Sequence, residues 1–441
     1  MNHSSGKIGF GTATSLVIAN MVGTGVFTSL GFQVLDITDG FALMMLWLIG
    51  GVISLCGALV YGELGTMFPN SGGEYNYLSK IYHPSVGFLA GWVSATVGFA
   101  APIAMAAMAL SKYVAGVFEN VNKVVVAIGV ILLMTVIHSL DLKSGSLFQR
   151  VITVLKVVVI LVIIFFGFSS GSKQDFSVVP VKGSWEVIFS GAFAISLYWV
   201  TYSYSGWNAA AYMAGEIENS KKNLPRSLLL GTLAVTIIYV LLNYTFLIST
   251  AIPDLKGKED IGLIAAKNIF GLTGGNIMGM IIAFLLLSAI SAMVMAGPRV
   301  IQTMGKDVPM LGFFTTTNKN GIPYVAVIVQ SVIAITLVIT AKFDFVLQFT
   351  SFSLNLFTFL TVLGIFVVSF KRDAGSGSRK IFMFFIPATI FLIFQVWILY
   401  KGFEMRSTES LLGLINIGIG FLFWIVAKIL TKNKTETQKK P

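Results

Sequence analysis

Long apolar segments dominate this chain, and each is about long enough to cross a lipid bilayer as a helix. A helix needs roughly 20 apolar residues to cross the hydrocarbon core, and segments of that kind recur about twelve times between short polar connections. We expect them near residues 8–32, 41–66, 86–114, 123–139, 148–168, 184–212, 226–251, 276–297, 323–341, 344–369, 381–401 and 409–430. The pattern predicts an all-α membrane protein with about 12 transmembrane helices in one polytopic domain, residues 1–441.

Two of these segments are interrupted midway by glycine-bearing stretches. Residues 21–25 read MVGTG, and residues 204–208 read YSGWN. Backbone polar groups need partners in hydrocarbon, so an opened helix at mid-membrane depth is stable only where it lines a cavity or contacts a ligand. A single interruption would be explained better by helix packing. Two interruptions, in corresponding places of two halves, are typical of the binding site of a secondary transporter.

The interruptions lie in the first and sixth segments, which divides the first ten segments into two sets of five. An odd number of crossings inverts the second set in the membrane, so the pattern predicts a 5+5 inverted repeat with broken helices 1 and 6. We assign repeat one to about 8–168 and repeat two to about 184–369. Two extra C-terminal helices follow at about 381–430; they carry no polar cluster, and we assign them no chemistry.

Together the two interruptions expose backbone groups of the kinds that suit a zwitterion. The N–H groups that begin the half-helix after Gly23 and Gly25 suit a carboxylate, and the Thr24 hydroxyl adds a further donor. The carbonyl groups that end the preceding half-helices, near residues 19–21 and 202–205, suit an ammonium group. The two sets together predict a site for a small molecule that carries both charges.

Composition agrees with a membrane protein and excludes a water-soluble domain. Hydrophobic residues make up 56% of the chain, charged residues only 11%, and the mean hydropathy is +0.85. In a soluble protein, the net charge of +11 would indicate a nucleic-acid partner. Here about 19 of the 30 lysines and arginines fall on the side of the two termini, and the positive-inside rule then places both termini in the cytoplasm. We therefore expect a multi-pass protein of the cell (inner or plasma) membrane, with no nucleic-acid partner.

Enzyme, metal and cofactor chemistry find no support in the motifs. His3, His83 and His138 are isolated, and neither an H-E-x-x-H nor a G-x-S-x-G motif occurs. The only cysteine, Cys56, lies within a span, so no internal disulfide forms and no cysteine outside the membrane is available to link a partner subunit. We predict no catalytic residue, no metal and no cofactor, and leave a partner subunit open. A channel is an open alternative, since broken helices also build pores.

At both interruptions the chain resembles the amino acid-polyamine-organocation (APC) transporter superfamily. Residues 18–27, IANMVGTGVF, are similar to its first-span motif G-[ST]-G-[IV]-F. Residues 204–208 and 214–226 are similar to the sixth span and following loop of its L-type amino acid transporter-like bacterial branch. The resemblance covers essentially the whole chain and implies a LeuT-like fold. Residues 299–308 depart from the family's usual loop after span eight, which weakens any transfer of gating detail.

The resemblance also implies roles for individual residues. It places substrate carboxylate contacts at Thr24 and Gly25, and ammonium contacts at the carbonyls of Met21, Tyr202 and Ser205. Gly23, Gly206 and Asn208 complete the predicted substrate-binding set. Tyr202 occupies the family's aromatic gate position, and Trp207 is the second aromatic gating candidate. For both aromatic residues, packing in the core is an equally good interpretation.

Lys156 is a further functional candidate because a lysine within a span is costly and must face protein or water. The L-type branch resembles this chain in placing a fifth-span lysine where sodium-coupled relatives hold a cation. Lys156 is therefore a predicted gating or coupling residue, either in sodium-independent exchange or in proton-coupled uptake. The alternative is a lysine that extends to the cytoplasmic interface near Arg150. Ser288 and Ser291 in span eight are either hydroxyls near this site or packing residues.

The span interiors constrain the charge of the substrate. We expect no buried acid for a cationic side chain, Glu63 being the nearest exception, at the end of span two. Small and apolar residues at 101–107 favour a neutral side chain. The sequence thus predicts a secondary active transporter of neutral L-amino acids. The alternative within the same fold is a carrier of polyamines or other organic amines.

Overall fold

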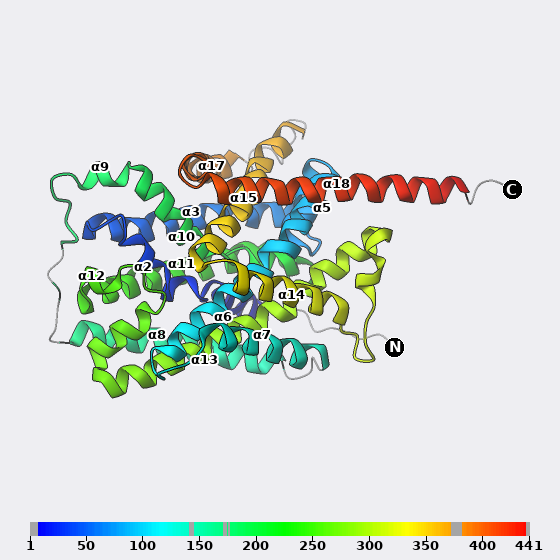
Figure 1. The fold of residues 1–441 in the computed structure, drawn as a ribbon. Helices are drawn as coiled ribbons and strands as arrows, with labels where there is room; N and C mark the ends of the chain where they lie inside the picture. The colour runs from blue at the N-terminus through cyan, green and yellow to red at the C-terminus, as the bar shows by residue number, and fades with distance from the viewer. Residues whose placement is uncertain (1–7, 141–144, 171–173, 175–176, 372–381, 438–441) are drawn as a thin grey trace.

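The computed structural model describes residues 8–140, 145–170, 174, 177–371 and 382–437, and in these ranges the regular secondary structure is helical apart from one isolated bridge (Figure 1). Nine helices in this part of the chain are long and apolar enough to cross a membrane, judged by length and composition. Two shorter apolar helices, Phe10–Met21 and Tyr324–Thr340, accompany them. The prediction of an all-helical membrane protein is confirmed. His3 and the side chain of Arg150 lie outside the described part.

The long helices follow the predicted segments closely. In chain order they are α3 (Gly40–Met67), α5 (Pro84–Val93) and α6 (Ala100–Ala115) joined through η2 (Ser94–Gly98), α7 (Lys123–Leu140), α8 (Gly145–Ser169), α11 (Ser220–Ser249), α13 (Ile261–Asp307), α14 (Tyr324–Thr340), α15 (Phe343–Lys371), α17 (Phe385–Met405) and α18 (Ser407–Thr437). The connections hold α4 (Gly73–Ile81), α12 (Ile252–Leu255), η4 (Pro309–Thr315) and η5 (Phe382–Phe384). The largest departure is α13, which is much longer than the predicted segment 276–297 because it merges two helices across a kink at Gly271, whose φ is +75°.

Both predicted interruptions are present. The first segment consists of α1 (Phe10–Met21), η1 (Gly25–Phe27) and α2 (Ser29–Gln33). The sixth consists of α9 (Ser184–Ile188), α10 (Gly191–Tyr204) and η3 (Ala209–Glu216). Val22 leaves the helical region with ψ 85°, which ends α1. Gly206 has φ +98°, a left-handed conformation that favours glycine, and it separates α10 from η3.

Small residues allow the helices to pack closely around α3. A Cβ atom added at Gly50 would lie 2.1 Å from Val200 of α10, and one at Gly51 would lie 2.3 Å from Thr236 of α11. At Gly62 the added atom would lie 2.9 Å from the Cα of Pro225. Lipid tails are as apolar as leucine, so helices in a bilayer associate through such close contacts. α3 therefore holds the broken helix α10 against the rest of the bundle.

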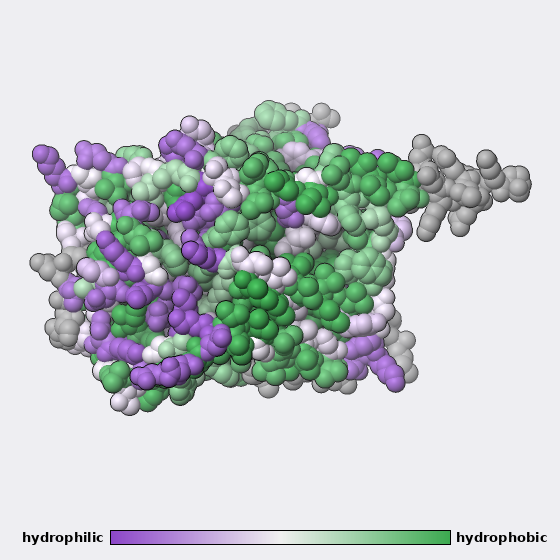
Figure 2. Space-filling view, in the orientation of Figure 1, coloured by the Kyte–Doolittle hydropathy of each residue, from purple (hydrophilic) through white to green (hydrophobic). Residues whose placement is uncertain are grey.

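The outer surface carries apolar side chains. Phe165 on α8, Ile339 on α14 and Leu422 on α18 are each more than 60% exposed. On the face seen in Figure 2, green apolar residues cover α14 and α18, and purple hydrophilic residues gather toward the end that carries α9 and α12. An exposed apolar surface of this kind is expected of a protein whose solvent there is lipid.

The two ends of the bundle are distinguishable. At one end, which we call the terminal side, Ile8 pairs with Ile217 just after η3: Ile8 N donates to the Glu216 carbonyl at 2.8 Å, and Glu218 N donates to the Ile8 carbonyl at 2.9 Å. The C-terminal part of α18 lies toward this end (Figure 1). The other end, which we call the opposite side, carries α9 and α12.

Candidate functional site

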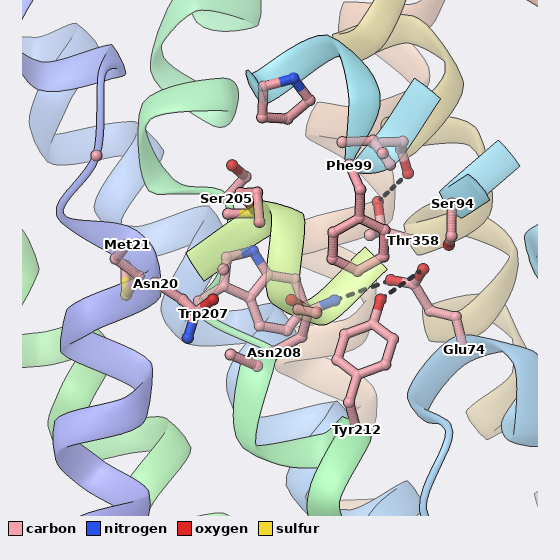
Figure 3. A pocket seen from close by; sticks show the side chains of 18 of the residues that line it. Asn20, Met21, Glu74, Ser94, Phe99, Ser205, Trp207, Asn208, Tyr212 and Thr358 are labelled. Carbon is pink, nitrogen blue, oxygen red and sulfur yellow. Dashed lines mark hydrogen bonds between the residues drawn. The ribbon is translucent and has the colours of Figure 1, made fainter. Parts of the chain in front are cut away.

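A cavity of about 560 Å³ lies between the two interrupted helices. Its walls come mainly from α1, η2, α6, α10, η3, α13 and α15. Every site residue predicted from the sequence lines it: Met21, Gly23, Thr24, Gly25, Lys156, Tyr202, Ser205, Gly206, Trp207 and Asn208. Figure 3 shows Asn20 and Met21 of the first break lying across from Ser205 and Trp207 of the second. The structure thus brings together residues that are about 180 positions apart in the sequence.

The two breaks are in direct contact, and glycine makes this possible. A Cβ atom at Gly25 would lie 2.5 Å from the Cα of Ser203, and one at Gly206 would lie 2.8 Å from the backbone carbonyl of Asn20. Each break therefore packs against the backbone of the half-helix that leads into the other break. Gly23 is different, since the nearest atom to its added Cβ is the Met21 carbonyl oxygen at 3.9 Å.

Gly206→Ala should lower the free energy of unfolding by about 2 kcal/mol or more, because alanine is strained at φ +98° and its methyl group meets the backbone of Asn20. Gly257→Ala is the matched control: Gly257 also has a positive φ, +68°, but its nearest neighbour is 4.0 Å away. Thermal unfolding of the purified variants in detergent measures both. Equal losses in the two variants would contradict a close contact between the breaks.

Backbone donors at the first break are available to a ligand. Among the described hydrogen bonds, the last that continues α1 runs from Val22 N to the Ile18 carbonyl, and the N–H groups of Thr24 and Gly25 have no backbone acceptor. The Thr24 side chain is buried. Free N–H groups at the start of a half-helix, on the wall of a cavity, suit a carboxylate.

The carbonyl acceptors are partly occupied. The Met21 carbonyl accepts from the hydroxyl of Tyr239 at 2.6 Å, and the Tyr202 carbonyl accepts from Ser205 N at 2.9 Å. No donor among the described residues contacts the Ser205 carbonyl. A carbonyl oxygen has two lone pairs, so all three can still accept from an ammonium group. Tyr239, fully buried on α11, is missing from the sequence-based site because an aromatic residue in a span looks like core.

Lys156 points at the first break. Its side chain is 3% exposed, and its Nζ donates to the carbonyl of Val22 at 3.1 Å. The side chain of Lys156 therefore does not extend toward the membrane interface, which was the alternative interpretation. Neither predicted serine contacts it: Ser288 donates to the Leu285 carbonyl, and Ser291 bonds to His138. Lys156 therefore donates a hydrogen bond directly to the opened backbone, whereas the two serines bond to other residues.

The expectation that no buried acid is available is wrong. Glu74, at the start of α4, is 4% exposed and lines the cavity. It accepts hydrogen bonds from Tyr61 at 2.7 Å, from Asn208 at 2.9 Å and from Tyr212 at 3.4 Å (Figure 3). Burial raises the pKa of its carboxyl group above the ordinary value, and the hydrogen bonds oppose this rise. Glu63, the acid singled out from the sequence, does not line the cavity.

Trp207 is both a cavity residue and a packing residue. A Cβ atom at Gly57 would lie 2.7 Å from its ring, and the ring centroids of Tyr61 and Phe391 are 4.7 Å and 6.3 Å away. Phe391 belongs to α17, to which we assigned no chemistry, and both it and Gln395 line the cavity. α17 contributes to the site because it packs on α10 and α3, a tertiary contact that its apolar sequence does not reveal.

The cavity is closed on the opposite side and open on the terminal side. Phe32 of α2 stacks on Trp199 of α10 with ring centroids 4.2 Å apart, and Phe343 of α15 lies 5.8 Å from Phe32. The same two helices are also joined by a hydrogen bond, since the hydroxyl oxygens of Ser29 on α2 and Ser203 on α10 are 2.8 Å apart. At the other end the lining includes exposed residues, namely Ser71, Glu216 and Arg299. In the described part of the chain, no group of three His, Cys, Asp or Glu residues is arranged to hold a metal.

Comparison with known proteins agrees with this geometry. A family model described as amino acid permease matches residues 8–438. The chain is 26% identical over 430 residues to the b(0,+)-type amino acid transporter 1 of Mus musculus, covering 95% of this chain and 87% of that protein. It is 29% identical over 381 residues to the serine/threonine exchanger SteT of Bacillus subtilis (strain 168), covering 85% of each. It is 23% identical over 425 residues to the Asc-type amino acid transporter 1 of Mus musculus, covering 94% of this chain and 79% of that protein.

Proposed function

Since this chain belongs to the amino acid permease family, we propose that it is a secondary active transporter of neutral L-amino acids that works by alternating access. The family and the similar proteins are transporters and not enzymes, so amino acid transport is the activity to be explained. The observation that carries the proposal is the meeting of two broken helices across one cavity, with free N–H groups at Thr24 and Gly25 and a carbonyl acceptor at Ser205.

The finer architecture belongs to the same proposal. We take the nine long helices, the short α14 and the two broken segments as about twelve spans in a LeuT-like arrangement. Repeat one then covers about 8–168, repeat two about 184–369, and the extra helices about 381–430. The break at the first span of each repeat supports this division. The excess of lysine and arginine on the terminal side supports cytoplasmic termini in a cell membrane.

With that orientation, the chain is in an inward-open form. The stack of Phe32, Trp199 and Phe343 closes the outer side, and the cavity reaches the cytoplasm past Arg299. Alternating access requires a second form in which the stack opens and the terminal side closes around the same site. Closure at one end argues against a channel, which needs both ends open at once.

Small apolar lining at Pro102 and Ala106 and the neutral donors around Glu74 favour substrates with neutral side chains. The names of the similar proteins also favour neutral side chains, since they include a serine/threonine exchanger and a transporter of large neutral amino acids. The second of these proteins is named as a small subunit. The alternative substrate class is polyamines or other organic amines, for which the free N–H groups of the first break have no use.

Lys156 is the proposed coupling residue. Its Nζ on the Val22 carbonyl supplies to the first break a positive charge that sodium supplies in sodium-coupled carriers of this architecture. A lysine that stays charged gives sodium-independent exchange, and one that releases its proton during the cycle gives proton-coupled uptake. Tyr202 and Trp207 are the proposed aromatic gates beside the substrate.

Uptake into liposomes separates exchange from proton coupling. Purified protein is reconstituted, and uptake of a radiolabelled mixture of neutral amino acids is measured with and without internal amino acid, and with an imposed pH gradient. Exchange predicts saturable uptake that needs internal substrate. Proton coupling predicts uptake driven by the gradient with empty liposomes. No uptake by folded protein under either condition would contradict the amino acid assignment.

A further inference from the structure

Glu74 is a buried carboxylate on the wall of the cavity, and its partners are neutral. The two ion pairs found in the described part of the chain, Lys112 with Glu259 and Lys401 with Glu404, do not include it. Its hydrogen-bond partners come from two different elements: Tyr61 lies on α3, whereas Asn208 and Tyr212 lie at the start of η3 and within it. Glu74 thus links the half-helix after the second break to α3.

The contact with Glu74 fixes the orientation of the Asn208 amide. Glu74 Oε1 accepts from both Tyr61 and Asn208, so the amide directs its nitrogen to Glu74 and its oxygen the other way. The observed bond runs from Asn208 Nδ2 to Glu74 Oε1 at 2.9 Å (Figure 3). No described donor contacts Asn208 Oδ1, and this atom is not among the buried unpartnered atoms of the described residues. Asn208 lines the cavity, and Oδ1 is the atom of its amide that the bond to Glu74 leaves available to a ligand there.

We propose that Glu74 is a positioning residue for side-chain selectivity: by holding the Asn208 oxygen toward the cavity, it makes the site prefer amino acids whose side chain carries a hydrogen-bond donor. Glu74 itself does not contact the substrate. The proposal rests on the proposed function, because it names which neutral amino acids that same site favours. Serine against alanine is the simplest pair, since the two differ by one hydroxyl group.

The preference follows from the cost of leaving a polar group unpaired. When alanine fills the site, it displaces water from Asn208 Oδ1 and offers no donor in return, whereas the serine hydroxyl donates to that oxygen. The substrate ammonium does not compete for it, since the ammonium has its own acceptors at the ends of α1 and α10, among them the Ser205 carbonyl. One hydrogen bond of this kind corresponds to roughly a fivefold difference in kcat/KM.

Glu74→Gln should lower the serine-over-alanine ratio of kcat/KM by roughly fivefold. The amide of glutamine offers both a donor and an acceptor, so Asn208 can bond to it in either orientation and its oxygen is no longer held toward the cavity.

Asn208→Asp alone brings two carboxylates into contact and should depress uptake at neutral pH. The double variant Glu74→Gln, Asn208→Asp exchanges the amide and the carboxylate between the two positions. The amide at position 74 then donates to the carboxylate at position 208, whose other oxygen is available to the cavity. The net charge is unchanged. It should restore uptake relative to Asn208→Asp and recover the ratio.

The experiment measures liposome uptake of radiolabelled serine and alanine by wild type, the two single variants and the double variant. Tyr61→Phe is the matched control, since it removes one donor to Glu74 without touching Asn208 and lies outside the cavity lining; its ratio should equal that of wild type. Failure of wild type to transport either amino acid contradicts the proposed function itself. Where wild type transports both, three results overturn the role of Glu74: no preference for serine in wild type, an unchanged ratio in Glu74→Gln, or a double variant that recovers neither uptake nor ratio.

Discussion

Gly25→Ala should reduce the initial rate of amino acid uptake about tenfold or more. The added methyl group would lie 2.5 Å from the Cα of Ser203, and a backbone atom cannot move aside as a flexible side chain can. The two broken helices must then separate, which displaces the N–H groups of Thr24 and Gly25 from the carbonyls of α10. Because the contact joins the two halves of the site, the same substitution should also lower the temperature of thermal unfolding.

Gly23→Ala is the matched control for this effect. It lies in the same break, two residues away, and its methyl group would meet only the Met21 carbonyl oxygen, at an ordinary contact distance of 3.9 Å. Gly23→Ala should unfold at the wild-type temperature. Equal unfolding temperatures for the two variants, together with normal uptake by Gly25→Ala, would contradict the packing of one break against the other.

Lys156→Met should reduce uptake by about 10- to 100-fold, the loss expected when a charged hydrogen bond to a buried group is removed. Methionine keeps the apolar stem of lysine but not its Nζ, so the Val22 carbonyl loses its donor and the first break loses its positive charge. The initial rate of exchange, per amount of folded protein in the liposomes, is the quantity to measure.

Lys267→Met is the control for removing a lysine. Lys267 also donates from Nζ to a backbone carbonyl, that of Gly116, at 2.9 Å, but it lies outside the cavity. It should retain most of the uptake. A similar loss in both variants would assign the effect of Lys156→Met to general stability and would contradict a coupling role for Lys156.

The sequence predicted the breaks and the lysine because each violates the ordinary pattern of a membrane helix. Two glycine-bearing interruptions and one lysine in apolar runs are visible without a structure, and α1 ends at Met21 and α10 at Tyr204 as expected. Glu74 was missed because it stands in a polar stretch, residues 70–76, that looks like a solvated loop. The packing of α4 against η3 and the contact with Tyr61 of α3 bury it. Phe391 and Gln395 were missed for the opposite reason, since nothing distinguishes one apolar helix from another until their neighbours are known.

The central claim is that the two breaks bind both charges of a zwitterion. The most direct test is competition against the uptake of a radiolabelled neutral amino acid by wild-type protein in liposomes. The competitors are the unlabelled amino acid, its methyl ester, which lacks the carboxylate charge, and the amine left after decarboxylation. The account predicts that only the intact amino acid competes, because the N–H groups at Thr24 and Gly25 need a carboxylate. Equal competition by the amine would contradict it and would make the protein a carrier of organic amines.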